Sequence, residues 1–137
     1  MIESQLRRLL HADDAADIRE IVRHVLKDNG LYKLRSCASG TEVLNCVVEF
    51  NPQMILLDFT MPQMTGSQVV RALQELDGIN MDEVALVLFA TASETVDINH
   101  FFRLGATDVI TKPFDSTTLL DFISEIWGEF LGKKGVA

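Results

Sequence analysis

Apolar residues recur along this chain with the spacing of an α-helix in five separate segments. Between residues 18 and 26 they fall at positions i, i+3, i+4, i+7 and i+8, which is one face of a helix, and Asn29-Gly30 would end it. Similar stripes predict helices over residues 41–50, from about 67 to 76, from near 93 to 104, and from 115 or 116 to 130.

Short apolar runs between these helices predict strands. The runs 54–57 and 84–90 are bounded by turn residues, which is typical of strands buried on both faces of a parallel sheet. Residues 31–37 and 108–111 predict two shorter strands, and the apolar residues before Asp13 predict the first. This alternation favours an α/β fold, a doubly wound five-stranded parallel sheet with helices on both faces.

The composition fits one globular domain. Of 137 residues, 47% are hydrophobic and 23% are charged, so the chain can bury a core without disulfides or metals. We expect a domain over residues 1–131 and a short C-terminal tail over 132–137. The longest apolar run, 84–90, is far shorter than the roughly 20 residues of a membrane span, and residues 1–10 do not resemble a signal peptide. The sequence therefore predicts a cytoplasmic protein with no membrane partner.

The charge balance and the cysteines restrict the function further. Twenty acidic and 12 basic residues give a net charge of -8, which argues against direct binding to a nucleic acid backbone. Cys37 and Cys46 match neither the spacing of a redox pair nor that of a zinc knuckle. We expect two free thiols.

Polar residues stand at or just beyond the ends of four predicted strands. They are Asp13, Asp14, Asp58, Thr91 and Lys112. The carboxyl ends of parallel strands meet at one edge of a sheet, where α/β proteins bind ligands. Three carboxylates at one point repel each other, so they indicate a cation such as Mg²⁺. The lysine and the threonine would then serve an anionic group, and a phosphoryl group is the obvious candidate.

Each of these residues alone has an ordinary explanation. Two adjacent acids suit the first turn of a helix, Thr91 suits a helix cap, and Lys112 before a proline suits an exposed turn. Asp58 follows four apolar residues, so it must either emerge at the edge of the sheet or be paired. Independent surface residues have no common reason to fall at four strand ends, so together they favour one site.

Four motifs in this order resemble the receiver domain of two-component response regulators. They are DD at 13–14, LLDFTMP at 56–62 followed by Gly66, ATA at 90–92 and TKPF at 111–114, and the resemblance covers nearly the whole chain. It implies a flavodoxin-like fold with strand order 2-1-3-4-5 and five helices. It also implies that Asp58 accepts a phosphoryl group from the phosphohistidine of a sensor histidine kinase or a histidine phosphotransfer protein.

The resemblance assigns a magnesium site. Asp14, Asp58 and the backbone carbonyl of Thr60 would be direct ligands, and Asp13 would act through water. Oxygen ligands of this kind suit Mg²⁺. His11 stands where the family usually has an aliphatic residue, and we expect it to be packed in the core or paired with an acid rather than bound to the metal.

The resemblance also assigns a phosphoryl-binding switch. Lys112 would bind a phosphoryl oxygen, the Thr91 hydroxyl would move to the phosphoryl group, and Ala92 would support them. Pro113 would follow a cis peptide bond that aims the lysine inward. Val109 replaces the aromatic residue that usually follows the threonine in its movement, so the sequence leaves that last step open.

The output surface is implied by the same resemblance. The fourth helix, fifth strand and fifth helix would change on phosphorylation and would bind a downstream protein or a second copy of the chain. On helical wheels Val96 and Phe122 lie off the main apolar stripes. Two interpretations stay open: they contribute to this surface, or they are ordinary exposed apolar side chains.

Three alternative functions deserve comparison. A magnesium-dependent phosphatase of the haloacid dehalogenase kind needs a second aspartate where this chain has Thr60. A flavin or nucleotide carrier needs a phosphate loop, whereas the first loop here is rich in aspartate. Within the receiver class, the chain could be a phosphorelay intermediate without its own output. The favoured interpretation is a signalling switch that promotes only its own phosphorylation and dephosphorylation.

Overall fold

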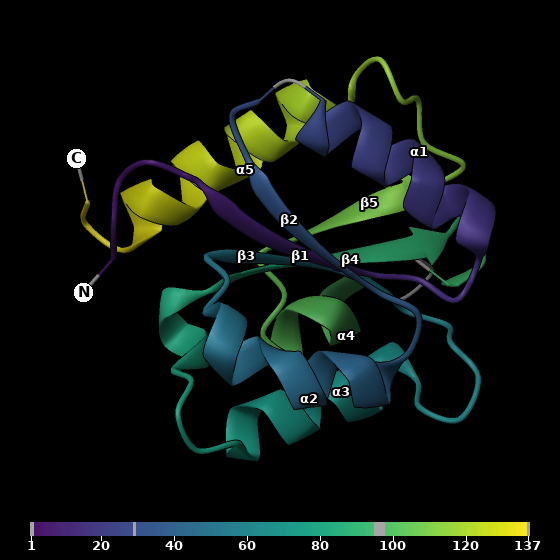
Figure 1. Ribbon diagram of the computed structural model, residues 1–137. Coiled ribbons are helices and arrows are strands. Elements are labelled where there is room, and N and C mark those ends of the chain that lie inside the picture. Colours follow the sequence, from purple (N-terminus) through teal and green to yellow (C-terminus); the bar gives the residue numbers. More distant parts are fainter. Residues whose placement is uncertain (1, 29, 95–97, 137) are drawn as a thin grey trace.

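The computed structural model describes residues 2–28, 30–94 and 98–136. Its centre is one sheet of parallel strands in the order β2-β1-β3-β4-β5 (Figure 1). The strands are β1 Arg8–Ala12, β2 Lys33–Cys37, β3 Met54–Asp58, β4 Ala85–Thr91 and β5 Asp108–Lys112. The predicted doubly wound sheet and its strand order are confirmed.

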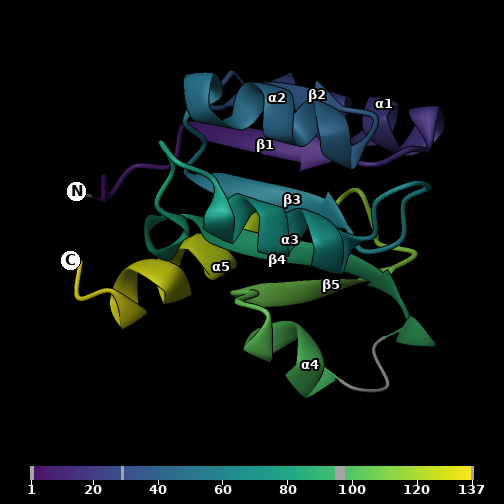
Figure 2. The ribbon, with the colours of Figure 1, turned by 90° about the horizontal axis from the view of Figure 1, so that it is seen from below.

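Five helices cover the two faces of the sheet. They are α1 Ala16–Lys27, α2 Gly40–Phe50, α3 Gly66–Glu75, α4 Ile98–Arg103 and α5 Leu119–Lys133, and a short 3₁₀ turn, η1 Met81–Glu83, precedes β4. Helices α1 and α5 lie on one face, and α2, α3 and α4 lie on the other (Figures 1 and 2). None of the described helices has the length and apolar character needed to cross a membrane.

Strand side chains alternate between two cores. Leu9 and Leu56 point into the core under α1 and α5, whereas Leu10 and Leu57 point into the core under α2, α3 and α4. All residues of β3 are buried because β3 lies inside the sheet and has helices on both sides. This double burial explains the unbroken apolar run at 54–57.

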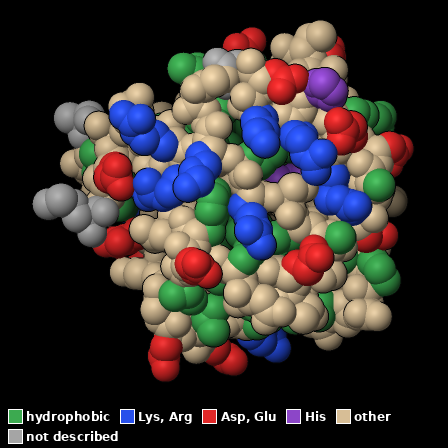
Figure 3. Space-filling model, in the orientation of Figure 1, with side chains coloured by type: hydrophobic (Ala, Val, Ile, Leu, Met, Phe, Trp, Pro, Cys, Tyr) green, Lys and Arg blue, Asp and Glu red, His purple; other side chains and the backbone are tan. Residues whose placement is uncertain are grey.

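The edge strand β2 is protected by charge. Its residues Lys33 and Arg35 are exposed, and Lys and Arg side chains gather on the face of the molecule that Figure 3 shows. Charged side chains on an edge strand hinder pairing with other sheets. This local basic character coexists with the overall charge of -8.

The predicted boundaries of the last two helices were partly wrong. Helix α5 begins at Leu119 rather than at 115 or 116, because the Asp115 carboxylate accepts hydrogen bonds from the amide and the hydroxyl of Thr117 and holds a turn there. Its end at Lys133 places the first two residues of the predicted tail in the helix. The fourth helix is described from Ile98, Ser93 lies in a turn, and residues 95–97 lie outside the described part of the chain.

Helix α3 begins with a capping box that also fixes the loop after β3. The Thr65 hydroxyl accepts a hydrogen bond from the Gln68 amide, and the Gln68 side chain accepts one from the Thr65 amide. At Gly66 the chain closes against Phe59, because the Gly66 amide donates to the Phe59 carbonyl at 2.6 Å. This close approach places the loop that contains Thr60.

Replacing Gly66 by Ala is expected to destabilise the fold by about 2 kcal/mol, because added core volume forces backbone shifts. A Cβ atom at residue 66 would lie 2.8 Å from the Phe59 Cα atom and 3.0 Å from its carbonyl oxygen. The matched control is Gly128→Ala in α5, where a Cβ atom meets nothing within 4 Å and should stabilise the helix by about 1 kcal/mol. Urea unfolding of both variants measures the difference, and equal stabilities would contradict the predicted contact.

Candidate functional site

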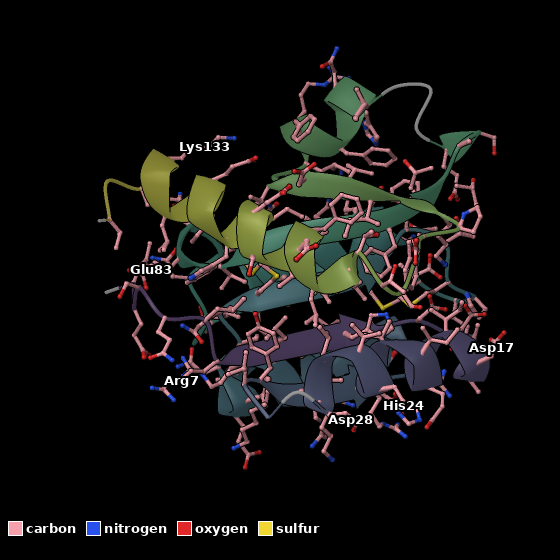
Figure 4. All side chains as sticks on the ribbon, turned by 90° about the horizontal axis from the view of Figure 1, so that it is seen from above. Arg7, Asp17, His24, Asp28, Glu83 and Lys133 are labelled. Carbon is pink, nitrogen blue, oxygen red and sulfur yellow. The ribbon has the colours of Figure 1, made fainter. Side chains whose placement is uncertain are left out.

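The predicted site residues lie together at the carboxyl ends of the strands. Asp58, Thr91 and Lys112 are the last residues of β3, β4 and β5, and Asp13 follows β1 directly. Thr91 and Lys112 are partners in the parallel register. In Figure 4, Asp17 of α1 lies at one end of the molecule, whereas Arg7 and Glu83, which precede strands, lie near the other end.

Three carboxylates form a cluster that could hold a metal ion. One oxygen each from Asp13, Asp14 and Asp58 lies within 4.8 Å of the other two. Asp13 and Asp58 are buried and Asp14 is exposed, so the cluster opens to solvent on one side. Two buried carboxylates that face a third favour a bound cation, and an all-oxygen set suits Mg²⁺.

Lys112 joins two of these carboxylates. Its Nζ atom lies 2.9 Å from the Asp58 Oδ1 atom and 3.1 Å from the Asp13 Oδ2 atom. Burial lowers the pKa of Lys112, but the hydrogen bonds to Asp58 and Asp13 outweigh burial and raise it overall. The site therefore contains a fixed positive charge at neutral pH.

The surroundings of Asp58 destabilise its ionised form. Burial raises its pKa, and the charge of Asp13 raises it further, while Lys112 and the Thr60 amide oppose the change. The net pKa lies above its ordinary value of 3.8. One lysine thus compensates only part of the negative charge, and a further cation would stabilise the ionised acid.

Backbone contacts hold Asp13 in place. Its amide donates to the Cys37 carbonyl at 3.1 Å, and its Oδ1 atom accepts from the Ala15 amide at 2.9 Å. The Arg19 guanidinium donates to the Asp13 carbonyl at 2.7 Å. Sequence reasoning missed Arg19, because only the folded path of α1 brings it back over the first loop.

A second residue that sequence reasoning missed is Glu94. Its Oε1 atom accepts from the Thr91 amide at 2.7 Å, and its Oε2 atom accepts a hydrogen bond from the Thr60 hydroxyl. Burial raises the pKa of Glu94, but the hydrogen bonds from Thr60 and Thr91 lower it overall. The signal in the sequence was the spacing T-x-x-E at 91–94, which is that of a capping box.

His11 is packed in the core. It is fully buried, its ring lies 5.7 Å from the ring of Phe89, and neither ring nitrogen has a hydrogen-bond partner among the described residues. Burial lowers the pKa of His11 to about 3, and the charges of Lys112 and Arg19 contribute. The packed alternative is therefore confirmed, and among the described residues no carboxylate bonds to the ring.

The remaining predicted positions lie beside the site. The peptide bond between Lys112 and Pro113 is cis, as the sequence analysis expected. Val109 pairs with Leu88 in the sheet and packs against the core under α2, α3 and α4. Ala92 lies in the turn after β4, and its supporting role stays a prediction.

The fold and the site together define a class of protein. The chain is a doubly wound, flavodoxin-like α/β domain, and a carboxylate cluster with one lysine lies where the strands end. Residues 9–124 match the model of the response regulator receiver domain family. The chain therefore belongs to this family, the phosphoacceptor signalling switches of two-component systems.

Named relatives agree with this assignment. The DNA-binding response regulator MtrA of Mycobacterium tuberculosis is 32% identical over 119 residues, which are 87% of this chain but only 50% of MtrA. The chemotaxis protein CheY of Bacillus subtilis is 25% identical, over 86% of this chain and 95% of CheY. The chain thus spans about half the length of MtrA and matches CheY over nearly all of CheY's length.

A solved structure shows the same fold. The chemotaxis response regulator CheY4 of Vibrio cholerae superimposes with a TM-score of 0.79 at 27% sequence identity, covering 89% of this chain and 99% of CheY4. The alternative of a haloacid dehalogenase-like phosphatase is not favoured, since the family match covers most of the chain.

Proposed function

We propose that Asp58 is the phosphoacceptor of this receiver domain. The observation that supports this proposal is the contact between the Asp58 carboxylate and Lys112 inside a cluster of three acids. A structural ion pair would not need two further carboxylates beside it. A phosphoryl site does, because the acids can bind the cation that accompanies the phosphoryl group.

The proposed reaction is transfer from a phosphohistidine. An Asp58 oxygen attacks phosphorus, the bond between phosphorus and the imidazole nitrogen breaks, and the imidazole leaves with the electron pair. The product is an acyl phosphate on Asp58. Lys112, already 2.9 Å from the Asp58 carboxylate, is placed to neutralise a phosphoryl oxygen.

We further propose that Mg²⁺ serves this site. Asp14, Asp58 and the Thr60 carbonyl would hold it directly and Asp13 through water, and the bound ion would neutralise charge between the acceptor and the phosphoryl oxygens. The raised pKa of Asp58 supports this assignment, because an added cation favours the ionised nucleophile.

Thr91 is the proposed switch residue. Its hydroxyl now lies 3.1 Å from the Ser93 hydroxyl, directly beyond the end of β4. To bind the phosphoryl group, the Thr91 hydroxyl would break its hydrogen bond with Ser93 and donate one to a phosphoryl oxygen. That exchange moves the start of the segment that leads to α4.

The proposed output surface consists of α4, β5 and α5. A groove of about 540 Å³ lies between β5 and α5, and its wall includes Val109, Ile126 and Phe122, which is 41% exposed. Val109 lines this groove at the position where the family has an aromatic side chain. We therefore propose that the partner binds in the groove itself. Val96, the other predicted contributor, lies outside the described residues.

The proposed partners follow from this scheme. A sensor histidine kinase or a histidine phosphotransfer protein would donate the phosphoryl group, and a second copy or a downstream protein would bind the output surface. MtrA is a DNA-binding regulator, and the match covers only 50% of it, which supports an output through a further domain or partner rather than direct binding of nucleic acid by this domain. The free thiols of Cys37 and Cys46 support a cytoplasmic location, and we propose no substrate other than the phosphoryl donor.

The test is incubation with acetyl phosphate and Mg²⁺, followed by measurement of the intact mass. We expect a gain of one phosphoryl group that hydroxylamine removes, because an acyl phosphate reacts with that nucleophile. The matched control replaces Mg²⁺ by a chelator and should show little gain. A stable gain that resists hydroxylamine would contradict an acyl phosphate, and no gain at all would contradict the proposed function.

A further inference from the structure

One carboxylate joins the two loops that flank the acceptor. Glu94 accepts a hydrogen bond from the Thr60 hydroxyl, in the loop after β3, and from the Thr91 amide, at the end of β4. Asp58 lies next to both loops, since it precedes Thr60 by two residues and its strand pairs with β4, which ends at Thr91. Glu94 thus spans the mouth of the site.

The same carboxylate faces the charges of the site. Lys112, which binds Asp58 and Asp13, also attracts Glu94 electrostatically. Glu94 therefore places a negative charge within the electrostatic reach of the lysine that is to bind the phosphoryl dianion. Like charges at short range raise each other's energy, so Glu94 and a phosphoryl group disfavour each other.

Glu94 and a phosphoryl group on Asp58 would both bind Thr91. Glu94 bonds to the amide and to the side chain of Thr91, and the Ser93 hydroxyl contacts the Thr91 hydroxyl. A phosphoryl group on Asp58 needs that hydroxyl turned towards it. The arrangement in which Glu94 and Ser93 hold Thr91 is therefore a closed state, and the arrangement in which Thr91 contacts the phosphoryl group is an open one.

We propose that Glu94 is a latch that holds the unmodified site closed and that the phosphoryl group displaces. This inference rests on the proposed function of Asp58. In the closed state Glu94 ties Thr60 to Thr91, and in the phosphorylated state repulsion releases the carboxylate from both. Coupling of this kind is reciprocal. If a phosphoryl group weakens the contacts of Glu94 by some factor, then removing those contacts strengthens phosphoryl binding by the same factor.

Glu94 is a positioning residue in this scheme, and two substitutions separate its contacts from its charge. In Glu94→Gln the side chain can still bridge the two loops but no longer repels an anion. In Glu94→Ala the bridge is also lost. The matched control is Glu75→Gln, an exposed acid of α3, which makes the same change in net charge.

The experiment measures binding of beryllium fluoride, a phosphoryl analogue, by calorimetry in the presence of Mg²⁺. We expect Glu94→Ala to bind about fivefold more tightly than the unmodified sequence, within the usual range of coupling between sites, and Glu94→Gln to fall between them. Glu75→Gln should bind as the unmodified sequence does. Hydrogen exchange at the Thr91 amide should be accelerated in Glu94→Ala alone, which checks the contact without any ligand.

The outcomes separate the latch from the proposed function. If the unmodified sequence binds no beryllium fluoride, the acceptor assignment is wrong and the latch is wrong with it. If it binds, and Glu94→Ala binds no more tightly, the latch alone is wrong. An equal gain in Glu75→Gln would attribute the effect to net charge and would also overturn the latch.

Discussion

Asp58→Asn is expected to abolish phosphorylation by acetyl phosphate, because an amide oxygen is a far weaker nucleophile than a carboxylate. The substitution keeps the size of the side chain and its place at the end of β3. Intact mass after incubation with acetyl phosphate and Mg²⁺ should show no gain. The control is Asp77→Asn, an exposed acid in the loop after α3, which should gain one phosphoryl group. A gain in Asp58→Asn would show that another residue is the acceptor.

The same substitution is expected to stabilise the protein at neutral pH without metal. The pKa of Asp58 is raised by burial above 3.8, so the folded state favours the protonated acid. This penalty on stability is fully present above the folded pKa and disappears as the pH falls to the unfolded value. Asn carries no such penalty, so urea unfolding at pH 7 should favour Asp58→Asn, and the gain should shrink on acidification. A less stable variant would contradict the expected cost of the buried charge.

Lys112→Met is expected to lower the free energy of unfolding by about 3 kcal/mol at pH 7, because it leaves buried carboxylates without their cation. Lys112 contacts Asp58 and Asp13, whose side chains are only 5% and 1% exposed. The pKa of Lys112 is raised above 10.5, so the lysine is charged at neutral pH, and its own charge is lost as the pH rises through the folded pKa. Urea unfolding with a chelator present measures the loss.

The control for this variant is Lys133→Met, which removes an exposed charge at the end of α5 and should change stability little (Figure 4). Two further results would separate charge from packing. The loss in Lys112→Met should shrink as the pH falls, because Asp58, whose pKa is raised by burial, then becomes neutral. It should also be smaller in the Asp58→Asn background, since one of the two acids is gone. If the loss of stability in Lys112→Met changes neither with pH nor in the Asp58→Asn background, the effect comes from packing rather than from charge.

Much of the fold was readable from local pattern. The spacing of apolar residues predicted each of the five α-helices and each strand. A helix buried on one face and a strand buried on one or both faces each give a characteristic spacing of apolar residues along the chain. Boundaries were less predictable where side chains compete with the backbone. Asp115 illustrates this, since its bonds to Thr117 delay the start of α5. Such a turn depends on the geometry of three consecutive residues rather than on apolar spacing.

The candidate site was predicted in its residues but not in its contacts. The positions of Asp58, Thr91 and Lys112 at strand ends followed from the apolar runs before them. The bonds that Arg19 makes to Asp13, and that Glu94 makes to Thr60, cross from one segment to another. Apolar spacing does not indicate such pairs, because the first depends on the path of α1 back over its own preceding loop and the second on how the loops after β3 and β4 approach each other.

The sequence by itself determined the α/β class, the family resemblance and the acidic residues of the site, since these depend on side-chain chemistry and on periods of two and 3.6 residues. The tertiary structure alone decided that Lys112 bridges Asp58 and Asp13, that His11 is fully buried in the core beside Phe89, and that Glu94 spans the mouth of the site. Those outcomes depend on distances of a few ångströms between distant segments. Only the packing of helices on the twisted sheet fixes such distances.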